Sequence, residues 1–75
     1  DHIFPNPTKG IVNISCASDE RMDIQVYSVN GQKMTANIYH DRRTIQVDLS
    51  SLPKGLYIMT IGDTKIKSRH KIILQ

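Results

Sequence analysis

The stretch RTIQVDLSSLPKGLYIMTI, residues 43–61, places a chain reversal between two segments with the pattern of β-strands. In its first half Ile45, Val47 and Leu49 alternate with polar residues, which is the period of a strand with one buried face. Residues 56–61 carry apolar side chains on both faces, which predicts a strand at the centre of a sheet. Between them, Leu52-Pro53-Lys54-Gly55 fits a type I turn, with proline at the second position and glycine at the fourth.

The same alternation continues on both sides of this stretch. Residues 11–16 and 22–29 each have one apolar face, and residues 65–74 predict a final strand or pair of strands. Asn30-Gly31 is the preferred pair for a two-residue type I′ turn, which would join residues 22–29 to residues 32–39. About six or seven short strands without helical spacing predict an all-β fold, a small immunoglobulin-like antiparallel β-sandwich.

Size and composition limit the domain to a thin core. The chain has 75 residues, 39% of them hydrophobic, and no tryptophan. Its single cysteine, Cys16, excludes an internal disulfide and follows Val12 and Ile14 at the strand period, so we expect it to point inward. No apolar run approaches the ~18 residues that cross a membrane. We interpret residues 1–75 as a single domain cut from a longer protein.

The titratable residues do not form a pattern typical of an enzyme. His2, His40 and His70 are far apart, and none pairs with Cys, Asp or Glu at the spacing of metal ligands. The sequence has no glycine-rich phosphate loop and no nucleophile elbow. It therefore predicts no catalytic residue, no metal site and no cofactor in this domain.

A basic stripe is predicted near the end of the chain, whose net charge is +3. Lys65, Lys67, Arg69 and Lys71 would share one face of a strand. One interpretation is contact with an acidic protein surface, or with anionic lipid or sugar. The other is an edge strand that lysines protect from aggregation. Nucleic-acid binding is disfavoured, because the stripe has no interleaved aromatic residues for base stacking.

The last residues, Ile72-Ile73-Leu74-Gln75, form an apolar segment. A strand here either completes the domain's own sheet or adds to the sheet edge of a partner. The first alternative is favoured, since so small a domain can hardly lose a strand.

Taken together, these motifs resemble the C-terminal sorting domain, type A, of the type IX (Por) secretion system of Gram-negative bacteria. The family pattern opens with an aromatic residue before Pro-Asn-Pro and a turn that ends in Gly, here Phe4, Pro5, Asn6, Pro7 and Gly10. A strand followed by Asn/Asp-Gly-Gln comes next, here Asn30-Gly31-Gln32.

The second half of the pattern matches as well. The motif Asp-Leu-Ser-Ser-Leu-Pro-x-Gly-x-Tyr corresponds to Asp48 through Tyr57, with Leu52, Pro53 and Gly55 at its fixed positions. A basic residue before an apolar terminal strand corresponds to Lys71 followed by residues 72–75. The chain ends in Gln75 where many members have Lys. The resemblance covers essentially the whole chain.

The resemblance implies a sorting function, with no catalysis by the domain itself. The implied partners are N-terminal cargo domains such as peptidases, the outer-membrane translocon with its shuttle protein, and a sortase-like surface peptidase. The cargo would pass through the periplasm and reach the cell surface or the extracellular medium, with attachment to an anionic lipopolysaccharide. No nucleic acid is expected as a partner, and the isolated domain is expected to be a monomer or weak dimer.

We expect the last strand to be the recognition element. Lys71 would guide binding electrostatically, and Ile72, Ile73 and Leu74 would make apolar contacts, with Gln75 at the end. Deletion of residues 71–75 is expected to abolish export. The remaining motif residues would act structurally: Gly55 and Tyr57 by positioning the preceding strand, and Pro5, Asn6, Pro7 and Gly10 by setting the turn at the junction.

Two alternatives remain. One is an immunoglobulin-like accessory module of an extracellular enzyme that binds carbohydrate or a surface. Such a module needs exposed aromatic residues on a flat face, and only Tyr27 and Tyr39 are candidates. The other is a passive spacer between domains, for which a chain that continues past residue 75 would be expected.

Overall fold

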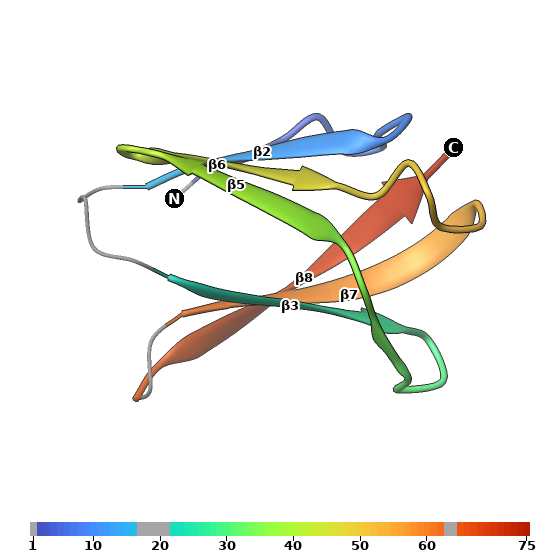
Figure 1. Ribbon diagram of the computed structural model, residues 1–75. Coiled ribbons are helices and arrows are strands. Elements are labelled where there is room, and N and C mark those ends of the chain that lie inside the picture. Colours follow the sequence, from blue (N-terminus) through green and yellow to red (C-terminus); the bar gives the residue numbers. More distant parts are fainter. Residues whose placement is uncertain (1, 17–21, 63–64) are drawn as a thin grey trace.

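The computed structural model describes residues 2–16, 22–62 and 65–75, whose strands form two stacked antiparallel sheets (Figure 1). The first sheet has the order β1-β2-β6-β5 and the second the order β4-β3-β7-β8. The strands are β1 (His2–Phe4), β2 (Ile11–Ser15), β3 (Asp23–Ser28), β4 (Lys33–Met34), β5 (Asn37–Asp41), β6 (Thr44–Asp48), β7 (Gly55–Gly62) and β8 (Lys67–Leu74). The predicted all-β sandwich is confirmed.

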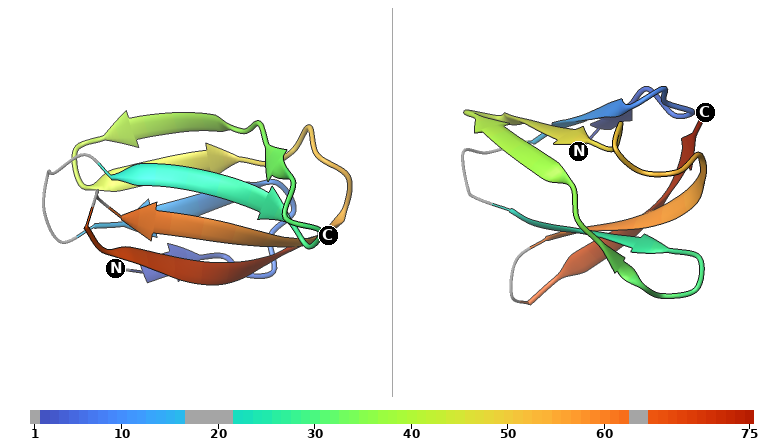
Figure 2. Two further views of the ribbon diagram at one scale, coloured as in Figure 1. Left: turned by 90° about the horizontal axis from the view of Figure 1, so that it is seen from below. Right: turned by 45° about the vertical axis from the view of Figure 1, so that its right-hand side comes forward.

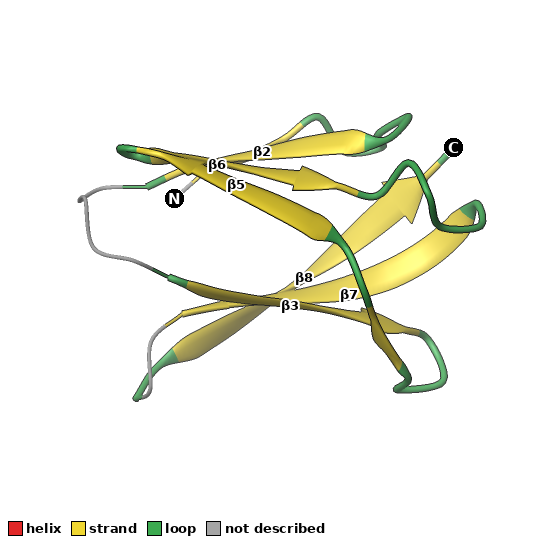
Figure 3. Cartoon of the chain, in the orientation of Figure 1, coloured by secondary structure: helices red, strands yellow, loops and turns green. Residues whose placement is uncertain are grey.

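Within the described ranges the secondary structure consists of strands, turns and loops, without a helix (Figure 3). Accordingly, this part of the chain holds no helix that is long and apolar enough to cross a membrane.

The core lies between the two sheets and consists of the inward residues of five strands. The alternation in the sequence correctly predicted the inward residues of β2, β3, β6 and β7, and Cys16 is buried among them as expected, whereas Ile72 and Leu74 of β8 had been expected at a partner surface. β7 has a paired strand on each side, which confirms its predicted interior position. The buried hydrophobic residues are Val12, Ile14, Cys16, Ile24, Val26, Ile45, Val47, Leu49, Tyr57, Met59, Ile61, Ile72 and Leu74.

The β3–β4 hairpin forms where it was predicted, but the prediction that its turn is of type I′ is wrong. That turn needs a positive φ at both central residues, and Gly31 has one (φ 87°) while Asn30 does not. Gly31 N donates to Ser28 O at 2.9 Å, and Ser28 N donates to Gln32 O at 2.8 Å. This is a three-residue loop in which a type I turn is followed by glycine in the left-handed region. In this loop the position that needs a positive φ is occupied by Gly31, and residues with a side chain disfavour that conformation.

Two strands at the edges differ from the expectation. Residues 32–39 do not form one strand, because β4 joins the second sheet while β5 joins the first. β1 was not predicted, and it pairs antiparallel with β2 so that Ile3 lies opposite Ile14. Residues 65–74 contain one strand, β8, which is the first of the two alternatives that the sequence left open.

The turn between β6 and β7 lies at an earlier sequence position than the predicted turn at residues 52–55. Its hydrogen-bonded turn is Leu49–Leu52, in which Leu52 N donates to Leu49 O at 2.9 Å. Asp48 fixes the turn, because its Oδ1 accepts hydrogen bonds from Ser50 N at 2.9 Å and from Ser50 Oγ at 2.6 Å. The side-chain bond first, and then the backbone bond, lower the pKa of Asp48 below its ordinary value of 3.8.

Ser50→Ala is expected to raise the pKa of Asp48 toward its ordinary value, because the variant loses the stronger of the two hydrogen bonds. Since the pKa is lower in the folded state, the stabilisation by Asp48 is fully present above the unfolded pKa and is lost as pH falls through the folded pKa. A carboxyl-carbon NMR titration of both proteins measures the shift. An identical Asp48 pKa in the two proteins would contradict this account.

Candidate functional site

β8 presents the predicted recognition residues on two opposite faces. Ile72 and Leu74 point into the core and are 1% and 4% exposed, whereas Lys71, Ile73 and Gln75 face solvent. The strand pairs with β7 along its whole length and forms an edge of the second sheet. It therefore completes the domain's own sheet, which is the alternative that the sequence favoured. A partner of the folded domain can reach the three exposed residues, and their recognition role stays a prediction.

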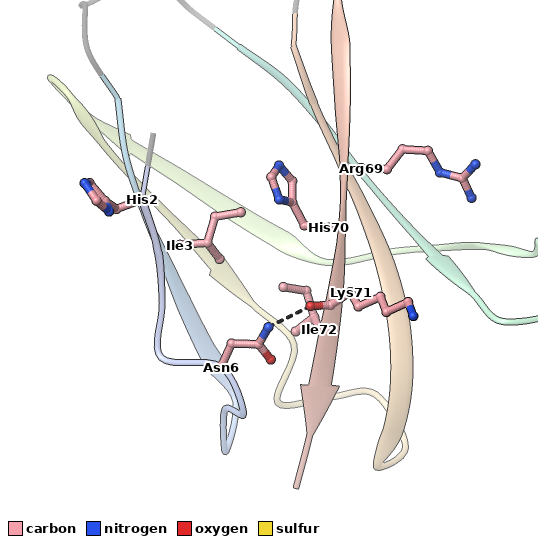
Figure 4. Close-up of a pocket in the computed structure, with 7 residues that line it drawn as sticks. All are labelled: His2, Ile3, Asn6, Arg69, His70, Lys71 and Ile72. Carbon is pink, nitrogen blue, oxygen red and sulfur yellow. Dashed lines mark hydrogen bonds between the residues drawn. The ribbon is translucent and has the colours of Figure 1, made fainter.

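Asn6 holds the outer edge of β8 with its side-chain amide. Its Nδ2 donates to Lys71 O at 2.7 Å (Figure 4), and its Oδ1 accepts from Ile73 N at 3.1 Å. The peptide bonds before Pro5 and Pro7, on either side of Asn6, are cis. In Figure 2 the blue N-terminal segment lies beside the red strand β8, as the two hydrogen bonds of Asn6 require. The Pro-Asn-Pro motif and the C-terminal motif, distant in sequence, thus meet in one place.

Thr8 continues this contact with its backbone. Its N donates to Ile73 O at 2.8 Å and its O accepts from Gln75 N at 2.8 Å, so that Thr8 forms a parallel bridge with Leu74. The side chain is buried, and its Oγ1 donates to Ile11 O at 2.6 Å and accepts from Gly10 N at 3.1 Å. We name residues 6–8 with their bonds to residues 71–75 the terminal clamp.

Sequence reasoning did not single out Thr8. The available signal was a hydroxyl residue two positions before a glycine, which is a pattern in which Ser or Thr bonds nearby backbone groups.

Gly10 connects the terminal clamp to the turn after β6. Gly10 O accepts a hydrogen bond from Leu49 N at 2.7 Å. A Cβ at Gly10 would lie 3.2 Å from Ser50 Cβ, which is closer than ordinary contact. The first and third sequence motifs therefore pack against each other.

Tyr57 connects the third motif to the core. Its ring is buried at 5% exposure, and its hydroxyl donates to Pro53 O. Leu52 is half-buried and packs against the core from the same loop. Gly55, at the start of β7, has φ 151°, which residues with a side chain rarely adopt. These four residues fix the conformation of the segment that leads into β7, the strand that pairs with β8.

The second motif lies apart from the terminal clamp. Asn30 and Gly31 belong to the β3–β4 turn, and both β3 and β7 lie between β4 and β8 in the sheet. The structure therefore brings together the first, third and fourth motifs at the β7–β8 end, and leaves the second at the far edge.

The exposed face of β8 carries the predicted basic stripe. Lys67, Arg69 and Lys71 alternate along it, and Lys65 precedes the strand. Lys67 Nζ lies 3.3 Å from Asp23 Oδ2, in a half-exposed pair that contributes little to stability. Apolar residues join the same face, because Ile73 is paired with Leu56, and Lys71 with Ile58. β8 is an edge strand with exposed lysines, so the two interpretations of the stripe are compatible.

Asn6→Ala is expected to lower the free energy of unfolding by about 1–2 kcal/mol, because two hydrogen bonds to the edge of β8 are lost. Amide hydrogen exchange at Ile73 should accelerate in the variant, since Asn6 Oδ1 accepts that proton. Asn37→Ala, at an exposed position of β5, is the matched control. Unchanged exchange at Ile73 would show that the terminal clamp does not protect this edge.

The described residues include no group of three or more His, Cys, Asp or Glu side chains that could hold a metal ion. Among them, the close pair formed by Ser68 Oγ and His70 Nε2, at 2.8 Å, is exposed.

Comparison with models of protein families gives a match over nearly the whole chain. The family model described as "Secretion system C-terminal sorting domain" matches residues 2–75. No curated protein matches the chain. A domain of this family is a type IX secretion sorting signal and not an enzyme. It interacts with the type IX machinery and leads to export across the outer membrane to the surface or the extracellular space. With all but its first residue matched, the chain belongs to the family of secretion system C-terminal sorting domains.

Proposed function

We propose that the type IX machinery recognises this domain through the exposed side of its last strand, with Lys71, Ile73 and Gln75 as the contact residues. The observation that carries the proposal is the alternation along β8. Its inward residues anchor the strand in the core, and its outward residues form a mixed basic and apolar face. Lys71 steers an acidic partner, and Ile73 provides apolar area that is removed from water on binding.

The neighbouring strand extends this face. Leu56 and Ile73 are paired across β7 and β8 and are 40% and 45% exposed. Two exposed apolar side chains beside a lysine are typical of a small interface with a polar rim. The terminal clamp holds this face in place, because Asn6 and Thr8 form hydrogen bonds with the backbone of residues 71–75 at the outer edge of β8.

The finer steps of the sorting function are also proposed. Residues 1–75 act as one domain behind N-terminal cargo domains, with residues 1–10 as the junction. The cargo crosses the periplasm, and the shuttle protein and the outer-membrane translocon bind the folded domain. A sortase-like surface peptidase then cuts before the domain and attaches the cargo to the cell surface. The family match over residues 2–75 supports export by the type IX system, of which these steps would be parts.

An export assay tests the proposal. The 75 residues are fused behind a periplasmically targeted fluorescent protein in a host with a type IX system, and a translocon-deficient strain serves as control. We expect reporter at the surface or in the medium only where the system works. Lys71→Glu and Ile73→Ser should each reduce export at least about 10-fold, as expected for residues at the centre of an interface.

Matched variants separate recognition from general effects on the surface. Lys33→Glu changes an exposed lysine on β4, and Ile11→Ser changes an isoleucine on β2 that is 41% exposed. Both should leave export unchanged. Equal export of the β8 variants and these controls would contradict recognition through β8. Reporter retained in both strains would contradict the sorting function itself.

The carbohydrate-binding alternative has weaker support. Tyr27 lies on β3 and Tyr39 on β5, which belong to different sheets. Each points away from the core, since Val26 and Ile38 beside them point inward. The two aromatic residues therefore face opposite sides of the sandwich and do not form one binding platform.

A further inference from the structure

We propose that the open half of the β8 edge, from Lys67 to Lys71, accepts an extended acidic segment of a partner protein as an added strand. The inference rests on the proposed function only for the partner, which would be a component of the type IX machinery. It adds the mode of binding, main-chain pairing at a sheet edge, and the chemistry of the segment that binds there.

The backbone groups of β8 that face β7 are hydrogen-bonded along the whole strand, whereas those on the outer edge are hydrogen-bonded only near its C-terminal end. β7 pairs with all eight residues of the strand. On the outer side, the terminal clamp bonds Lys71 O, Ile73 N, Ile73 O and Gln75 N. Because outward groups recur at every second residue, Arg69 N, Arg69 O and Lys71 N point to the same side. No described residue bonds these three groups there, so a short stretch of main-chain donors and acceptors is open.

A hollow lies next to this open stretch. Its volume is about 480 Å³, and it is lined by His2, Ile3, Asn6, Arg69, His70, Lys71 and Ile72. Figure 4 shows that the side chains of Arg69 and Lys71 point away from Ile3 and His70. These two residues therefore offer their backbone to the hollow. The hollow thus leaves space for a strand at the same place where the backbone groups are unpaired. Asn6 lies at one end of this site.

The side chains define which segment fits. On a strand added here, successive side chains alternate between the two faces of the sheet. One set would enter the hollow beside Ile3, His70 and Ile72, which favours apolar residues. The other set would lie on the exposed face beside Arg69 and Lys71, neither of which has a carboxylate partner among the described residues. Opposite charges on neighbouring strands attract, so this set favours Asp and Glu.

The same charges disfavour a second copy as the occupant. Pairing of β8 with β8 of another molecule would place Lys67, Arg69 and Lys71 beside the same residues. Like charges on adjacent strands are destabilising. The edge therefore rejects self-pairing and selects an acidic strand.

A peptide titration tests the inference directly on the 75-residue chain. The probe is the acetylated and amidated peptide Glu-Val-Glu-Val-Glu-Val-Glu, and the control replaces every Glu by Lys. We expect the largest amide NMR shifts at Arg69 and Lys71, and affinity at least about 10-fold lower for the lysine peptide. The chain made by chemical synthesis with an N-methyl group on Arg69 keeps the side chain but loses the outward N–H, and should bind at least about 10-fold more weakly.

Either of two results would overturn the inference: no shift at Arg69 and Lys71, or equal binding by the N-methyl chain with its circular dichroism unchanged. In the export assay, Arg69→Pro removes the same N–H at an edge position that tolerates proline, and Arg69→Ala is its control. Export of Arg69→Pro at the level of Arg69→Ala would refute strand addition while leaving the sorting function intact. No export of the unchanged domain would refute the sorting function, and the peptide titration would still decide the inference.

Discussion

Ile72→Ala is expected to lower the free energy of unfolding by about 3 kcal/mol, whereas Ile73→Ala should lower it by less than about 1 kcal/mol. The two residues are adjacent on β8 and chemically identical, but Ile72 is 1% exposed and Ile73 is 45% exposed. Ile72 therefore leaves a cavity in the core when truncated, and Ile73 loses only surface contacts. A domain of this size has a total stability of about 4–11 kcal/mol, so the first change removes a large part of it.

Urea unfolding of the two variants, followed by circular dichroism, measures the difference. Equal losses would show that β8 does not hold the described register. The pair also predicts a contrast in export: Ile73→Ala should impair export with the fold intact, whereas Ile72→Ala should act through stability. Deletion of residues 71–75 cannot make this distinction, because it removes Ile72 and Leu74 from the core together with the exposed residues.

Gly62→Ala is expected to lower the free energy of unfolding by about 3 kcal/mol or more, and the melting temperature by roughly 12–24 °C. A Cβ at Gly62 would lie 2.0 Å from Ile66 O and 2.7 Å from Lys67 Cα. Both atoms belong to the backbone, so no side-chain rotation relieves the overlap. The start of β8 would have to move away from the end of β7, although the two strands pair at Gly62 and Lys67.

Gly31→Ala is the matched control for this substitution. No atom lies within 4 Å of a Cβ at Gly31, and the cost there is conformational, about 1–2 kcal/mol for a positive φ. Thermal unfolding of both variants compares a steric cost with a conformational one. A Gly62→Ala variant as stable as Gly31→Ala would contradict the close approach of the two strands.

Much of the fold could be predicted because it depends on local signals. The period-two alternation identified the inward residues of β2, β3, β6 and β7, and three motifs marked the reversals. The details of the turns were less predictable. Asn30-Gly31 and Leu52–Gly55 have residues that suit several turn types, and the strands that the turns connect decide among them.

The candidate site was only partly predictable. Lys67, Arg69 and Lys71 shared one face in the sequence, and the same period places Ile73 with them and Ile72 and Leu74 opposite. The period of two therefore distinguishes Ile73, which a partner can contact, from Ile72 and Leu74, which the core buries. The terminal clamp could not be predicted, because the bonds of Asn6 and Thr8 to β8 span most of the chain and depend on how the two sheets stack.

The terminal clamp also determines how the domain carries mechanical load. Thr8 and Leu74 are bridged in parallel, so tension between the two ends of the chain pulls the two segments past each other lengthwise. The bonds of Asn6 and Thr8 to residues 71–75 run across that direction and are loaded together in shear rather than opened one after another. Together with the β1–β2 pairing, which lies nearer the N-terminus, these bonds are the first contacts that such tension loads, before the rest of the sandwich.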